Sequence, residues 1–115
     1  MMDSISWRNF TVQELELAQT ARNNGNEGRA RVCARRAAGH VIGEYLFRNK
    51  IDLGTGSALE RLRYIYSAEN TDPEARETAS HFLVHTTPEY KLPIEADLIA
   101  DVDLLAKQLL GESLD

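Results

Sequence analysis

One segment in the second half of the chain carries side chains that could cleave RNA. It reads RETASH and places four residues between Arg76 and His81. In such a site an arginine stabilises the charge of the phosphorane, and a histidine moves the proton of the 2′-hydroxyl group. Five positions turn a helix by about 140°, so a second subunit would have to gather the two side chains into one cleft. The same spacing recurs at Arg35 and His40, which shows that it also arises by chance.

The same segment offers a partial set of metal ligands. Glu77, His81 and His85 follow one another at intervals of four residues, which would place them on one face of a helix. Zinc accepts one carboxylate and two imidazoles, but the sequence suggests neither a fourth ligand nor outer partners. The alternative is a polar face turned to solvent. We predict that the protein uses no metal and no other cofactor.

A third candidate lies in the stretch from Asn26 to Lys50, which is rich in alanine and arginine. Arg31, Arg35 and Tyr45 could line a pocket for a nucleotide or another small molecule. The arginines of this stretch divide between two faces of a helix, so they form no continuous basic stripe, and DNA binding is not expected. The chain from Glu69 onward is acidic. Ion pairs with it, in one chain or across a dimer, are the alternative role of the arginines.

Apolar periodicity and capping residues predict five helices that position these side chains. The sequences Thr11-Val-Gln-Glu14 and Ser57-Ala-Leu-Glu60 are typical of a capping box at a helix start. Gly111 is placed to end the last helix. The predicted helices are 11–22, 26–48, 58–68, one that opens at 71–74 and ends before a connection at 86–92, and 93–110. No alternating strand pattern is present, so we expect an all-α, up-and-down bundle.

The composition is that of one ordinary globular domain. The chain has 115 residues, 43% of them hydrophobic and 27% charged, with a net charge of −5. No apolar run approaches the roughly 18 residues of a membrane span, and the first residues do not resemble a signal peptide. Cys33, the only cysteine, fits a reducing compartment. We predict a cytoplasmic protein with an irregular arm at 1–10, one helical domain at 11–111 and a tail at 112–115.

The order of these pieces resembles the HEPN-domain proteins, a family of small bacterial and archaeal helical bundles. An opening helix ends at a small polar turn (ELELAQTARNNGNEG), and a long alanine-rich helix follows (ARVCARRAAGHVIGEYL). A short helix comes after a glycine-containing loop (SALERLRYIY). The helix with Arg76 and His81 and an acidic last helix (IEADLIADVDLLAKQLL) complete the order. The resemblance covers about residues 10–110.

This resemblance implies two functions. Ribonuclease members of the family, often toxins of toxin–antitoxin pairs, use an R-x4–6-H motif at a dimer interface, which here would be Arg76 and His81. Those members usually have Asn, Asp or His after the arginine, whereas this chain has Glu77, whose carboxylate repels RNA phosphate. Other members act as nucleotide-binding or partner-binding modules. We therefore expect a homodimeric, non-catalytic binding or regulatory module. The alternative is a metal-independent ribonuclease that binds RNA and is partnered by an antitoxin protein.

Overall fold

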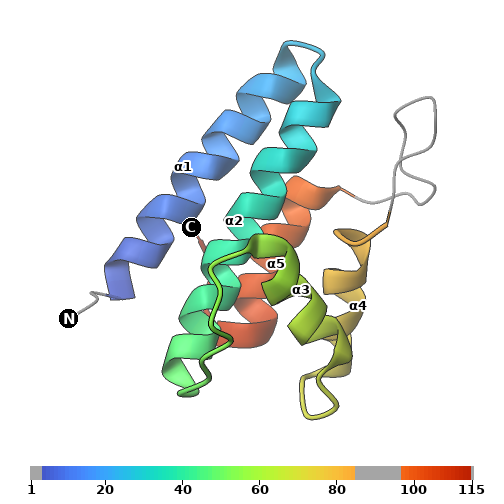
Figure 1. The fold of residues 1–115 in the computed structure, drawn as a ribbon. Helices are drawn as coiled ribbons and strands as arrows, with labels where there is room; N and C mark the ends of the chain where they lie inside the picture. The colour runs from blue at the N-terminus through green and yellow to red at the C-terminus, as the bar shows by residue number, and fades with distance from the viewer. Residues whose placement is uncertain (1–3, 85–96, 115) are drawn as a thin grey trace.

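The computed structural model describes residues 4–84 and 97–114, which form helices joined by loops (Figure 1). The helices are α1 (Ser4–Asn23), α2 (Glu27–Arg48), α3 (Ala58–Ser67), α4 (Pro73–His81) and α5 (Leu98–Leu110). No strand occurs in these two ranges, so the prediction of a small all-α bundle is confirmed. Within the same ranges, none of the helices has the length and apolar character needed to cross a membrane.

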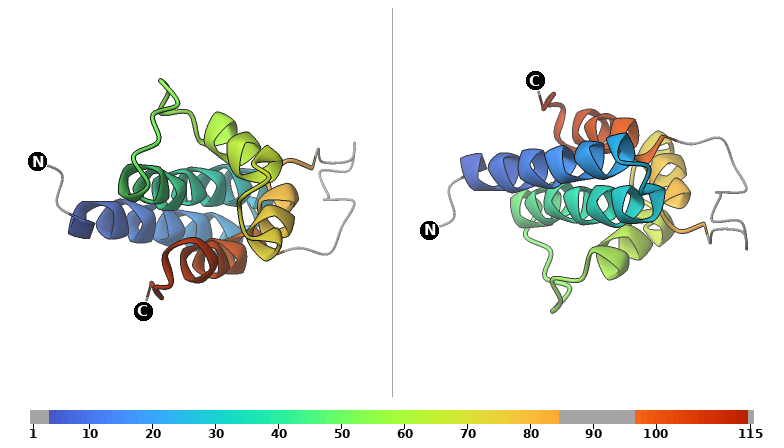
Figure 2. Two further views of the ribbon diagram at one scale, coloured as in Figure 1. Left: turned by 90° about the horizontal axis from the view of Figure 1, so that it is seen from below. Right: turned by 90° about the horizontal axis from the view of Figure 1, so that it is seen from above.

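Helix α2 is the centre of the bundle because it contacts α1, α3 and α5. Figure 2 shows α1 and α2 side by side, with α3 on one side of the pair and α5 on the other. Small side chains dominate the buried surface of α2, which lets neighbouring helices pack closely against it. Apolar residues at helical spacing predict the buried face of this helix, and all but the half-buried Tyr45 are buried: Ala30, Cys33, Ala34, Ala37, Ala38, Val41, Ile42 and Leu46.

Local sequence explains where three of the helices begin. Gly25 turns the chain between α1 and α2 with a φ of 78°, which glycine adopts without strain. Asn26 then caps α2, because its side chain accepts a hydrogen bond from the backbone N–H of Arg29 (3.1 Å). Ser57 caps α3 and Asp72 caps α4 in the same way. The predicted starts of these three helices are confirmed.

The predicted start of the first helix is wrong. Helix α1 begins at Ser4, so the segment predicted as an irregular arm is helical from residue 4. Trp7 is buried in the core there, and this burial supplies the stabilisation that helix ends lack on their own. The hydroxyl of Thr11 does not cap the helix but donates a hydrogen bond to the carbonyl oxygen of Trp7 (2.7 Å).

The predicted start of the last helix is also wrong. Helix α5 begins at Leu98, because the Asp97 side chain accepts hydrogen bonds from the N–H groups of Ile99 and Ala100 and so caps it. Residues 93–96, which were predicted to be helical, lie outside the described ranges. The predicted end is confirmed, since Gly111 terminates α5 with a φ of 68°.

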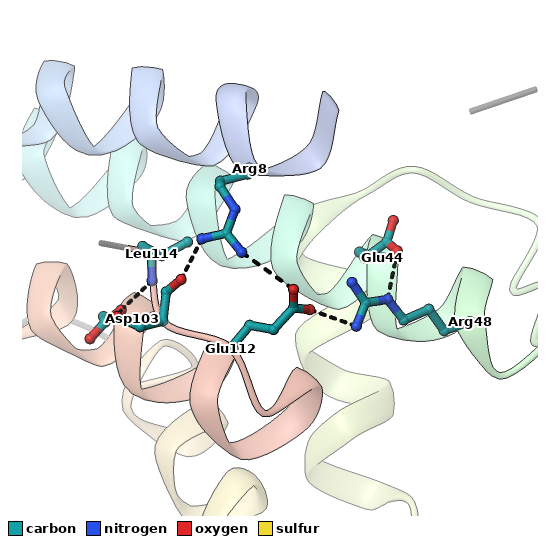
Figure 3. A network of polar contacts seen from close by, with 7 residues as sticks. Arg8, Glu44, Arg48, Asp103, Glu112 and Leu114 are labelled. Carbon is teal, nitrogen blue, oxygen red and sulfur yellow. Dashed lines mark hydrogen bonds and ion pairs between the residues drawn. The ribbon is translucent and has the colours of Figure 1, made fainter. Parts of the chain in front are cut away.

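The segment predicted as a C-terminal tail folds back on the bundle (Figure 3). The Glu112 carboxylate lies between Arg8 of α1 (3.4 Å) and Arg48 of α2 (2.6 Å). Arg48 also binds the buried carboxylate of Glu44 (2.7 Å). A further ion pair joins Arg22 to Asp97 (3.0 Å). Of the arginines in the basic stretch, Arg48 makes the predicted pairing with the acidic half of the chain within one copy of the protein.

Candidate functional site

Arg76 and His81 lie on the same short helix but contact different parts of the bundle. The Nε atom of Arg76 donates a hydrogen bond to the carbonyl oxygen of Tyr66 near the end of α3 (3.1 Å). His81, the last residue of α4, instead faces α5, where its Nδ1 atom is 2.9 Å from Oδ2 of Asp101. Within residues 4–84 and 97–114, no hydrogen bond or ion pair joins Arg76 to His81. One copy of the chain therefore does not bring the predicted catalytic pair into contact.

His81 and Asp101 form an acid–base pair where α4 meets α5. Burial raises the pKa of the Asp101 carboxyl group above its usual value, and the hydrogen bond with His81 opposes part of that shift. A carboxylate behind Nδ1 orients an imidazole and leaves Nε2 for other contacts; here Nε2 is 3.8 Å from the Glu77 carboxylate. Such a pair can move a proton, but the Arg76 guanidinium that would bind a phosphate is directed to α3.

The helix that was predicted to carry Glu77, His81 and His85 is shorter than expected. Helix α4 ends at His81, and residues 82–84 are not helical. His85 itself lies outside the described ranges. Among the described residues, no three His, Cys, Asp or Glu side chains are grouped so that they could hold a metal ion.

The predicted ligand residues Arg31, Arg35 and Tyr45 are spread along α2. Arg31 and Tyr45 are about four helical turns apart, roughly 21 Å along the axis at 1.5 Å per residue, which is too far to line one small pocket. Tyr45 packs against the core. The Nε atom of Arg35 is buried and has no hydrogen-bond partner in the described part of the chain. These three side chains do not form a joint site within one copy.

A groove that the sequence did not reveal runs between α1 and α3, with α2 as its floor. In Figure 1, α1 runs alongside α2 on the left, and α3 starts beside α2 and runs from it toward α4. The groove consists of two adjoining hollows of ≈ 250 Å³ and ≈ 270 Å³, and both are lined by His40 of α2 and Arg61 of α3. We call it the α1–α3 groove. Its other lining residues are Ser6, Trp7, Phe10, Glu14, Arg36, Gly39, Gly43, Glu44, Gly56 and Ala58.

Two glycines of α2 allow α3 to come close at this point. A Cβ atom placed on Gly39 would lie 2.7 Å from the Cβ of Ala58, and one on Gly43 would lie 2.6 Å from Nη1 of Arg61. Arg61 therefore lies across α2, where its Nη1 donates a hydrogen bond to the carbonyl oxygen of Gly39 (2.9 Å). The glycines cost helix propensity, but they place a cation over the floor of the groove.

The groove contains two buried polar atoms of opposite kind without a partner. The Nε of Arg61 and the Oε2 of Glu14 are shielded from solvent and make no hydrogen bond within the described ranges. Leaving a buried polar group unpaired costs about 1–3 kcal/mol. Because both side chains line the groove, a ligand that turns them toward it and offers an acceptor to Arg61 and a donor to Glu14 would remove that cost. Arg36 is exposed at the rim, whereas the charge of Glu44 is balanced by Arg48.

His40 lines the groove together with Arg61 and Glu14. It stacks on Phe10, with the ring centroids 5.4 Å apart. Burial lowers the pKa of His40 below 6.5; the Glu14 carboxylate opposes this shift, and the Arg61 guanidinium adds to it. The imidazole can therefore donate or accept a hydrogen bond at neutral pH. With Phe10 at 52% exposure, the groove combines apolar ring surface with donors and an acceptor, a combination that can bind a ligand.

Sequence reasoning missed the groove because its residues come from three helices. Gly39 and Gly43 indicate a close approach of some neighbour to α2, but they do not say which helix approaches. The R-x4-H match at Arg35 and His40 includes the groove histidine but the wrong arginine. Arg61 reaches His40 only because α3 packs on α2.

Comparison with known proteins identifies no relative of this chain. No protein-family model matches it, and neither a curated protein nor a solved structure shows significant similarity.

Proposed function

We propose that this chain is a non-catalytic, HEPN-like binding or regulatory module that holds its ligand in the α1–α3 groove. The observation that carries the proposal is the pair of buried, unpartnered polar atoms, Arg61 Nε and Glu14 Oε2, beside the exposed ring of Phe10. Ligand sites typically combine apolar walls with a few placed polar groups. Binding of nucleotides or other small molecules is assigned to this groove rather than to Arg31, Arg35 and Tyr45.

We further propose that the protein is cytoplasmic and forms a homodimer. Leu59 and Tyr66 are both exposed on α3, and they offer apolar surface for a second copy. Sedimentation at several protein concentrations tests the dimer. We expect Tyr66→Glu to shift the protein toward the monomer, and a wild-type protein that stays monomeric at high concentration would contradict the dimer.

A fragment screen followed by nuclear magnetic resonance tests the binding site without assuming a ligand. We expect fragments that join an aromatic ring to a carboxylate or phosphate to shift the backbone amides of Gly39, His40 and Gly43. Arg61→Gln should weaken these fragments, whereas Arg63→Gln should not, because Arg63 pairs with Glu60 on the exposed side of the same helix (2.8 Å). Fragments that gather on α4 and leave the groove unchanged would contradict the proposal.

A second candidate function is a metal-independent ribonuclease, acting as a toxin with an antitoxin protein as its partner. It is favoured by the orientation of the His81 ring by Asp101. A quenched fluorescent RNA, incubated with purified protein and EDTA, separates the two functions. The binding proposal predicts no cleavage above background. Cleavage that is lost in both Arg76→Ala and His81→Ala would replace it with the ribonuclease.

A further inference from the structure

We infer that the α1–α3 groove receives an amphipathic, acidic α-helix of a partner protein. The inference rests on the proposed function, because it names the occupant of the same groove. It is carried by three properties of the groove: the length of its apolar border, the division into two hollows, and the excess of arginine around it.

The apolar border is longer than a small molecule would cover. Phe10 and Leu17, two helical turns apart on one side of α1, are 52% and 46% exposed. On α2, Val32 and Phe47 are 40% and 58% exposed. They lie beyond the lining of the two hollows, but helical spacing puts them on the same side of α2 as Gly39 and His40. The distance along α2 between Val32 and Phe47 is roughly 22 Å at 1.5 Å per residue, the length of a helix of about four turns. Exposed apolar surface that follows a groove in this way is typical of helix-binding proteins.

The two hollows match successive anchors of a helix. They adjoin each other, and His40 and Arg61 belong to the lining of both. A bound helix presents apolar side chains three or four residues apart on one face. One anchor would enter the hollow lined by Trp7 and Gly43, and the next would enter the hollow lined by Gly39 and Ala58.

The charges around the groove select an acidic partner. Its titratable lining residues are Glu14 of α1, Arg36, His40 and Glu44 of α2, and Arg61 of α3. His40 is uncharged at neutral pH and Glu44 is paired with Arg48, which leaves two arginines against one carboxylate. Arg29, two turns from Arg36 on the same side of α2, is also exposed. Glutamates beside the apolar stripe of the partner would pair with these arginines, and a lysine or hydroxyl would face Glu14.

Nucleic acid fits the groove less well than a helix does. A phosphate backbone needs a continuous run of cations, whereas the Glu14 carboxylate lies among the arginines here. The acidic helix of the chain itself, α5, is not available as the occupant, because its Val102 and Leu105 are buried in the core.

A matched set of synthetic peptides tests the inference. The first is a helical peptide of about 15 residues with leucines at helical spacing and glutamates on both flanks. The second replaces the glutamates by lysines, and the third replaces the leucines by serines. Trp7, the only tryptophan of the chain, lines one hollow and reports binding by its fluorescence. We expect the glutamate peptide to bind saturably and at least about tenfold more tightly than either of the other two.

Variants of exposed residues then locate the contact. Arg36→Glu should weaken the glutamate peptide about tenfold and strengthen the lysine peptide, a reversal that loss of folding cannot produce. Phe10→Ala should weaken the binding of both the glutamate peptide and the lysine peptide. Arg63→Glu, on the far side of α3, is the matched control and should change neither affinity. Circular dichroism should be unaltered in all three variants.

Each other outcome overturns the inference in a recognisable way. Fragments that bind the groove when none of the peptides does would leave the proposed function standing and exclude the helix. Equal binding of the glutamate and lysine peptides would exclude selection by charge.

Two other occupants would be recognised by different results. A short single-stranded RNA that shifts groove resonances and displaces the glutamate peptide would assign the groove to nucleic acid. Groove resonances that move on dilution of the protein would assign the groove to a second copy of the chain. If neither fragments nor peptides bind the groove, the proposed function and the inference both fail.

Discussion

Helix α4 and the α1–α3 groove each contain an arginine and a histidine, but the two residues come from one helix in the first case and from two helices in the second. On α4, Arg76 and His81 are close in sequence, but each is already bonded to a different helix. In the groove, Arg61 and His40 come from different helices, yet they line the same two hollows. Arg61 also keeps one buried donor unpaired. Closeness along a helix is therefore a poorer guide to a joint site than packing between helices.

The difference has a simple geometric cause. Two residues five positions apart on a helix leave it in directions about 140° apart, so other elements engage them separately. Residues on the facing sides of two packed helices are directed into the same space. Because Gly39 and Gly43 have no Cβ atom, α3 can come closer to α2 at this point.

The two regions should differ most in what a phenylalanine contributes to stability. Phe82, directly after α4, is 2% exposed and belongs to the core, whereas Phe10 at the groove is 52% exposed. Phe82→Ala should lower the free energy of unfolding by about 4 kcal/mol through loss of buried surface and formation of a cavity. Phe10→Ala should lower it by less than about 0.5 kcal/mol. Urea denaturation measures both, and an equal cost would mean that Phe10 is part of the core.

The floor of the groove can be tested with one matched pair of glycine substitutions. At Gly39 a new Cβ meets the Cβ and Cα of Ala58 at 2.7 Å and 3.1 Å, and these atoms cannot move away without displacing α3. Gly39→Ala should therefore cost about 2 kcal/mol. At Gly43 the new atom meets the mobile end of Arg61, and the gain in helix propensity of about 1 kcal/mol should offset the contact. Urea denaturation measures the stability of both variants. A Gly43→Ala protein that is less stable than the Gly39→Ala protein would contradict this packing.

The contact between α4 and α5 should show a dependence on pH. Burial raises the pKa of Asp101 above 3.8, so the folded protein binds this proton more tightly than the unfolded chain does. The resulting stability is complete below pH 3.8 and is lost as the pH rises through the raised pKa. Asp101→Asn removes the titration. The melting temperature of the variant minus that of the wild type should therefore increase across this window.

Asp103 provides a control of opposite sign on the same helix. A hydrogen bond from the Leu114 N–H lowers the pKa of Asp103 below 3.8. Its contribution to stability is present above pH 3.8 and is lost as the pH falls through the lowered pKa. For Asp103→Asn, the melting temperature of the variant minus that of the wild type should decrease as the pH rises. Equal slopes for the two variants would show that the burial of Asp101 is not the cause.

The smallest effect concerns the titration of His40. Its imidazole resonances should shift with a midpoint below 6.5, because burial lowers the pKa of this group. Glu14→Gln removes the charge that opposes the shift and should lower the midpoint further. Arg61→Gln removes a neighbouring positive charge and should raise it. A midpoint that neither substitution moves would place Glu14 and Arg61 away from His40.

Three predicted helix starts were correct, and the cause of each is local. Asn26, Ser57 and Asp72 cap helices through hydrogen bonds to backbone groups two or three residues away, so neighbouring letters of the sequence suffice. The start of α1 was missed because it depends on the burial of Trp7 against distant residues. The start of α5 was placed at Pro93, although Asp97 supplies a cap that the sequence does contain.

The candidate site was less predictable than the fold. Arg76 and His81 were recognised because both belong to one short motif, but no local rule states that Tyr66 and Asp101 engage them separately. In the sequence, only the two glycines Gly39 and Gly43 point to the groove, and they do so indirectly.

The sequence alone determined the number of helices, the buried face of α2 and most helix ends, because periodicity and capping act between residues a few positions apart. Tertiary structure alone decided which polar groups meet. The meeting of Arg61, His40 and Glu14 depends on how α3 and α1 pack on α2, and that packing results from the shape of the whole core. Closely packed helices leave few alternative arrangements, so a groove that no short segment encodes is still a definite property of this chain.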